Sequence, residues 1–215
     1  MKKNLTELVF IIDRSGSMAG LESDTVGGMN SLLKKQRGEE GEALVTTVLF
    51  NDDCRMLHDR LDIKKVKPME EHDYIPAGCT ALLDAVGSTI EHIARIHRYA
   101  RAEDVPERTL FVITTDGMEN ASRIFSTERV KKMIEHEKEK YGWEFMFLGA
   151  NIDAVKTAGD IGICADRATG YISDSRGTAL NYEVMSAAVS SLRRSKALPG
   201  DWKLPVEEDC KARKA

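Results

Sequence analysis

An uninterrupted apolar run, Val9 to Ile12, restricts the fold of this chain more than any other feature of the sequence. A strand with one face in water alternates apolar and polar side chains, so a continuous apolar run predicts a strand covered on both faces. The run ends at Asp13 and leads directly into Arg14-Ser15-Gly16-Ser17. These polar residues should therefore follow the carboxyl end of a buried strand, which is where ligands bind in open parallel α/β sheets.

The rest of the chain alternates helix patterns with strand patterns. Apolar residues spaced three and four apart predict amphipathic helices, and β-branched apolar runs predict strands. Helices are expected over 21–36, 82–96, 126–140, 152–158 and 178–196, and strands over 43–50, 108–115, 143–148 and within 161–172. The tight turn Asn51-Asp52-Asp53 leads to a shorter strand near 55–58, which predicts an antiparallel edge. The expected fold is a three-layer, doubly wound α/β structure with a mostly parallel central sheet, one antiparallel edge strand and helices on both faces.

Length and charge limit the domain organisation and the partners. A chain of 215 residues can form one α/β domain, which we expect over residues 1–197, followed by a charged tail over 198–215. Pro205 lies in this tail, so we expect the tail to be loosely held, with Trp202 docking on the domain. The formal net charge of −4, with acidic and basic residues interleaved, provides no basic stripe for a nucleic acid.

Cysteine spacing and hydropathy bear on the cellular compartment. Cys54, Cys79, Cys164 and Cys210 are scattered without a Cys-x-x-Cys pair, which argues against a zinc knuckle and a dithiol redox motif. The N-terminus lacks the features of a signal peptide, and no stretch approaches the roughly 20 apolar residues that span a bilayer. We therefore expect a soluble, cytoplasmic protein with reduced thiols and no membrane partner.

Oxygen-bearing side chains recur at three loops that should share one edge of the sheet. Asp13, Ser15 and Ser17 follow the first strand, Thr80 precedes a helix, and Asp116 follows the buried strand 108–115. For Thr80 alone, an N-cap role would explain the residue equally well. Together, two carboxylates and three hydroxyls without a histidine or thiolate are ligands for a hard cation, Mg²⁺ or Mn²⁺, rather than Zn²⁺.

These motifs, DRSGS, GCT and TTDG in this order, resemble the von Willebrand factor A domain with its metal-ion-dependent adhesion site. The resemblance extends over about residues 5–197, and its stand-alone cytosolic members from bacteria and phages are the most similar in organisation. It implies that Asp13, Ser15, Ser17, Thr80 and Asp116 form the metal site. The family usually has Gly-Gly-Thr in the second loop, whereas Cys79 replaces the second glycine here. A positive φ at this position would strain a cysteine; Cys79 could also meet a soft metal, or be a half-buried residue that packs the loop.

The expected function is protein binding. The resemblance implies a domain in which an Asp or Glu of another protein completes the coordination of the metal, without catalysis by the domain itself. One alternative is a Mg²⁺-dependent phosphohydrolase or phosphotransferase, which would also hold a metal at strand ends. No phosphate-binding glycine loop and no Gly-x-Ser-x-Gly motif supports that alternative. A second alternative is a purely structural metal that holds the three loops together.

Overall fold

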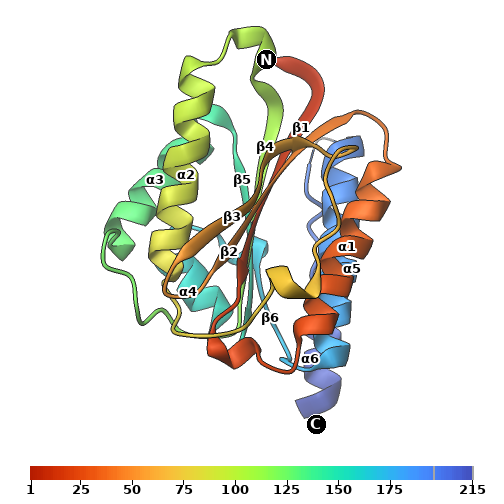
Figure 1. The fold of residues 1–215 in the computed structure, drawn as a ribbon, viewed down its shortest axis with the longest axis vertical. Helices are drawn as coiled ribbons and strands as arrows, with labels where there is room; N and C mark the ends of the chain where they lie inside the picture. The colour runs from red at the N-terminus through yellow and green to blue at the C-terminus, as the bar shows by residue number, and fades with distance from the viewer. Residues whose placement is uncertain (196, 215) are drawn as a thin grey trace.

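The computed structural model describes residues 1–195 and 197–214. Within them it contains a six-stranded sheet and six α-helices (Figure 1). In chain order, the elements are β1 (Lys2–Asp13), α1 (Glu22–Arg37), β2 (Glu42–Phe50), β3 (Cys54–Asp62), α2 (Leu82–Tyr99), β4 (Pro106–Thr115), α3 (Thr127–Tyr141), β5 (Glu144–Ala150), α4 (Ala154–Asp160), β6 (Ala168–Tyr171), α5 (Ser175–Ser195) and α6 (Leu204–Lys214).

The strand order is β3-β2-β1-β4-β5-β6, and β3 alone pairs antiparallel. The chain first moves from β1 to β2 on one side and then returns to place β4 on the other side of β1. The strand order therefore reverses between β1 and β4, which creates a crevice at their carboxyl ends. Parallel pairing of Ile12 with Thr114 brings the ends of these two strands to the same level of the sheet.

The buried run in β1 contributes to both layers of the core. Leu8, Phe10 and Ile12 pack on the side covered by α1, α5 and α6, whereas Val9 and Ile11 pack on the side covered by α2, α3 and α4 (Figure 1). Successive side chains of a strand point to opposite faces, so a strand between two helical layers has to be apolar at every position. The three-layer α/β fold, with its antiparallel edge strand, is confirmed.

The tail differs from the prediction of a loosely held segment. Residues Leu204–Lys214 form α6, and Pro205 lies in its first turn, where a missing N–H breaks no helical bond. Trp202 docks as expected: it is 6% exposed and its Nε1 donates to the carbonyl of Asp166 at 2.8 Å. Val206 is also buried, and Arg213 pairs with Asp174 at the start of α5. Burial of the tail against the domain thus outweighs its charged composition.

None of the helices among the described residues has the length and apolar character needed to cross a membrane. All four cysteines are free thiols.

Candidate metal centre

Asp13, the last residue of β1, begins the site. Its side chain is 1% exposed, and its Oδ1 accepts a hydrogen bond from the backbone N–H of Ser15 at 2.7 Å. This bond folds the chain tightly after the strand, and Gly16–Met18 then forms a short 3-10 turn. The turn brings Ser15 Oγ and Ser17 Oγ to 3.0 Å from each other. Ser15 is buried, whereas Ser17 is exposed at the mouth of the crevice.

Asp116 follows β4 and lies beside Asp13. The backbone N–H of Asp116 is 3.3 Å from Asp13 Oδ2, which also accepts a hydrogen bond from the hydroxyl of Thr115 at 2.7 Å. The Asp116 side chain is 2% exposed, and its Oδ2 accepts a hydrogen bond from Ser173 Oγ. Its Oδ1 is buried and has no hydrogen-bond partner among the described residues. The site therefore contains a buried carboxylate oxygen to which none of the described residues donates a hydrogen bond.

Thr80 completes the constellation from the third loop. It is 3% exposed, and a Cβ placed on Gly117 would lie 3.1 Å from Thr80 Oγ1 and 3.6 Å from Ser17 Oγ. Both hydroxyls thus surround the residue that follows Asp116, and the absence of a side chain at Gly117 keeps the space between them open. Thr80 is not the N-cap of α2, because Ala81 occupies that position and the helix begins at Leu82. The alternative interpretation of Thr80, as the residue that caps the helix, is therefore wrong.

The loop after β4 is fastened to the start of α2. Asn120 exchanges two hydrogen bonds with the backbone of Thr80, at 2.9 and 3.1 Å. Glu119 accepts from the N–H of Leu83 at 2.9 Å, and Asp84 accepts three backbone N–H groups of residues 123–125 at 2.8 to 2.9 Å. The position of Thr80 relative to Asp116 is consequently fixed by many polar contacts within the protein.

The second loop uses glycine where positive φ is required. Gly78 has φ +75°, and a Cβ there would lie only 1.8 Å from Asp52 Oδ2. Cys79 does not have a positive φ, so the expected strain at this cysteine is absent. Its side chain is exposed rather than half-buried, and its N–H donates to Asp52 Oδ2 at 3.0 Å. Hydrogen bonding to Asp52 raises the pKa of the Cys79 thiol, which keeps it in its protonated, weakly ligating form.

The structure brings together all five residues that the sequence predicts. Two supporting residues escaped the sequence analysis, namely Thr115, which donates to Asp13, and Ser173, which donates to Asp116. Both residues lie at the end of a strand or just beyond it: Thr115 is the last residue of β4, and Ser173 comes two residues after β6. Examining the polar residues at the end of every predicted strand would have found them.

The donor set fits a hard cation. Two carboxylates and three hydroxyls supply oxygen only, and Asp116 Oδ1 is a buried acceptor that a cation would neutralise. Within the described ranges, no group of three or more His, Cys, Asp or Glu side chains is arranged to hold a metal ion. A metal here would thus depend on the serine and threonine hydroxyls as much as on the acids.

Comparisons with known proteins give the fold but no close relative. No family model matches the sequence, and no curated protein matches it. The structure is similar to proximal thread matrix protein 1 from the mussel byssus with a zinc-occupied MIDAS motif (TM-score 0.55, 18% identity, 86% of this chain and 46% of that one). It is also similar to the von Willebrand factor type A protein from Catenulispora acidiphila (TM-score 0.54, 16% identity, 86% of this chain and 42% of that one). A third similar structure is the vWF domain of the type V pili tip protein Mfa5 from Porphyromonas gingivalis (TM-score 0.60, 9% identity, 86% of this chain and 94% of that one).

The chain spans less than half the length of the mussel and Catenulispora proteins, but most of the Mfa5 domain. The strand order of the sheet, its antiparallel edge strand and these structural matches lead to the same assignment. This chain therefore has the fold of the von Willebrand factor type A domains.

Proposed function

We propose that the protein is a metal-dependent protein-binding module. Asp13, Ser15, Ser17, Thr80 and Asp116 hold a divalent cation, Mg²⁺ or Mn²⁺, and an Asp or Glu side chain of another protein completes its coordination. The observation that carries the proposal is the buried Asp116 Oδ1, which has no partner among the described residues and lies in the crevice with the three hydroxyls.

The charge of the donor set favours binding of an external acid. Asp13 already accepts hydrogen bonds on both carboxylate oxygens, and three of the five donors are neutral hydroxyls. Asp13 and Asp116 balance the charge of a divalent ion, but because its other protein ligands are neutral hydroxyls, such an ion can still accept a further carboxylate. The metal would supply this electrophilic position; the protein's residues hold it and surround it.

Exposed apolar side chains next to the site support a protein ligand. Met118, two residues after Asp116, is 72% exposed, and Ile75, two residues before Ala77, is 61% exposed. The N–H of Ala77 donates to the carbonyl of Arg14, which places this segment beside the serine turn. Apolar side chains around a polar centre are typical of protein interaction surfaces.

The printed description of the mussel protein names a zinc-occupied MIDAS motif. That description supports a divalent cation as the resident ligand of this fold's site, while the all-oxygen donor set of this chain favours Mg²⁺ or Mn²⁺ over Zn²⁺.

The proposal is tested by affinity capture with the full chain as bait. We expect a partner that is retained in Mg²⁺ or Mn²⁺ and released by EDTA, and that Thr80→Val, which keeps the shape but removes the hydroxyl, no longer captures. Thr127→Val, at an exposed threonine in α3, is the matched control and should capture normally. Replacing the metal-contacting Asp or Glu of the identified partner by its amide should abolish capture.

Two outcomes would favour the alternatives. A metal-dependent increase in melting temperature without any metal-dependent partner would point to a structural ion. Metal-dependent hydrolysis of p-nitrophenyl phosphate that disappears in Asp13→Ala would point to a phosphohydrolase.

A further inference from the structure

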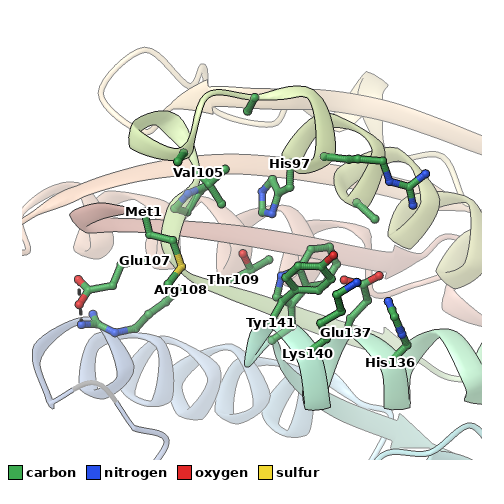
Figure 2. A pocket seen from close by; sticks show the side chains of 16 residues that line it. Met1, His97, Val105, Glu107, Arg108, Thr109, His136, Glu137, Lys140 and Tyr141 are labelled. Carbon is green, nitrogen blue, oxygen red and sulfur yellow. Dashed lines mark ion pairs between the residues drawn. The ribbon is translucent and has the colours of Figure 1, made fainter.

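A second candidate site lies at the opposite end of the sheet from the metal centre. A cavity of about 810 Å³ opens between the ends of α2 and α3 and the beginning of β4 (Figure 2). Arg108 lines it, seven residues before Thr115 on the same strand. At about 3.3 Å per residue this corresponds to roughly 23 Å, so the cavity is separate from the metal centre. Its volume falls within the range of pockets that bind small organic molecules.

The cavity contains a buried acceptor that nothing satisfies. Glu137 on α3 is 7% exposed, and Figure 2 shows it pointing from this helix toward the side of the cavity formed by α2. Its Oε2 has no hydrogen-bond partner among the described residues. Burial raises the pKa of Glu137, although His136, His97, Lys140 and Arg98 partly offset this effect. A buried acceptor without a partner is costly, and a bound hydrogen-bond donor would remove that cost.

Cations dominate the rest of the polar lining. Arg98 and Lys140 both line the cavity. Arg108 is also among the lining residues, but its guanidinium pairs with Glu107 at 3.3 Å and donates to the carbonyl of Arg193 on α5 at 3.4 Å, and Figure 2 shows it turned away from Glu137. Apart from the paired Arg108 and Glu107, Arg98 and Lys140 leave one positive charge in excess over Glu137, which favours an anionic ligand.

Aromatic side chains provide a flat, apolar wall. Trp143 is 5% exposed and stacks on Phe111 with ring centroids 5.3 Å apart. His97 meets Trp143 edge to face at 5.3 Å, and its Nε2 is held by Glu7. Tyr141, which also lines the cavity, is 52% exposed. A planar ring can pack against such a wall with little loss of conformational entropy on the protein side.

We propose that this cavity binds a small heteroaromatic anion the size of a mononucleotide, with a ring N–H group donating to Glu137 and the anionic group facing Arg98 and Lys140. The guanine ring matches Glu137 best, because its edge presents two adjacent N–H donors to a carboxylate. Adenine presents only its exocyclic amine. This site is independent of the proposed metal centre.

Isothermal titration calorimetry in EDTA tests the proposal, because chelation prevents a phosphate from binding through a metal. The probes are GMP, AMP, guanosine and inorganic phosphate, and quenching of tryptophan fluorescence gives a second readout. We expect GMP to bind at least tenfold more tightly than inorganic phosphate, and guanosine to bind more weakly than GMP. Glu137→Gln and Arg98→Gln should each weaken GMP binding by about tenfold or more, as expected for loss of a charged hydrogen bond or ion pair in a pocket.

Glu139→Gln is the matched control, since Glu139 is an exposed acid on the same helix and does not line the cavity. It should bind GMP like the wild type, and circular dichroism should show that all variants are folded. Absence of GMP and AMP binding at millimolar concentration would overturn the proposal. Equal affinity for GMP and inorganic phosphate, or unchanged GMP binding by folded Glu137→Gln, would also overturn it.

Discussion

Replacing Asp116 by asparagine should have opposite effects on the metal-free and the metal-bound protein. The Asp116 side chain is 2% exposed, lies next to the equally buried Asp13 carboxylate, and has one oxygen without a partner among the described residues. A buried polar group without a hydrogen bond costs about 1–3 kcal/mol, and more when it is charged. Asparagine removes the charge while it keeps an oxygen for Ser173 Oγ–H.

We therefore expect Asp116→Asn to stabilise the metal-free protein by about 1–3 kcal/mol. For a chain of this size, each kcal/mol shifts the melting temperature by about 2–4 °C, which gives an increase of about 2–12 °C. In the wild type, metal at a hundred times its dissociation constant should add about 2.7 kcal/mol, or about 5–11 °C. Asp116→Asn should lose this metal-dependent increase, because the charged ligand is gone.

Differential scanning fluorimetry in EDTA and in titrations of MgCl₂ and MnCl₂ measures both effects. Asp160→Asn is the control, because Asp160 is an exposed acid at the end of α4; it should leave both values unchanged. The reasoning is refuted if Asp116→Asn keeps the metal-dependent increase, or if the wild type shows none at millimolar metal.

Three further substitutions test other parts of the structure. Burial tends to raise the pKa of Asp84, but hydrogen bonds from three backbone N–H groups outweigh burial and lower this pKa below its ordinary value of 3.8. The charged Asp84 side chain therefore stabilises the fold fully above pH 3.8, and this stabilisation is lost as the pH falls through the lower pKa of the folded protein. In urea denaturation, Asp84→Asn should accordingly cost about 1–3 kcal/mol at pH 7 and less at pH 2; an equal cost at both pH values would contradict this. Burial raises the pKa of Glu137, so its charged form destabilises the fold as pH rises above the ordinary 4.5; Glu137→Gln should increase stability at pH 8 and lose that advantage below pH 4.5. Trp202→Ala should cost about 3–5 kcal/mol in the same assay, and a loss under 1 kcal/mol would show that α6 adds little to the domain.

The clustering of the candidate metal ligands was predictable because their positions follow from the sheet. Asp13 and Asp116 each come directly after a continuous apolar strand, and parallel strands place their carboxyl ends at one edge. Thr80 was predicted only in combination with the oxygen-bearing residues of the other two loops and through the resemblance, since nothing local distinguishes it from a helix cap. The structure rejects the cap and instead places Thr80 beside Gly117.

Other features depend on contacts between distant segments. Ser173 lies 57 residues beyond its acceptor Asp116; its place just after β6 makes it a candidate, but only the folded structure shows this bond. The tail was predicted as loose from its charges and Pro205, but burial of Trp202 and Val206 decides its structure. The cavity around Glu137 is equally invisible in the sequence, because α2, α3 and β4 create it jointly.

Apart from α6, local patterns determined which segments form the strands and α-helices, since the periodicity of apolar residues reports how many faces of each segment are buried. They also determined that acidic and hydroxyl side chains gather at one edge of the sheet. Only the tertiary structure decided which oxygens already have hydrogen-bond partners and which, like Asp116 Oδ1 and Glu137 Oε2, remain available for a ligand. The physical reason is that satisfying a buried polar atom requires a partner within about 3 Å, and that partner usually comes from a distant part of the chain.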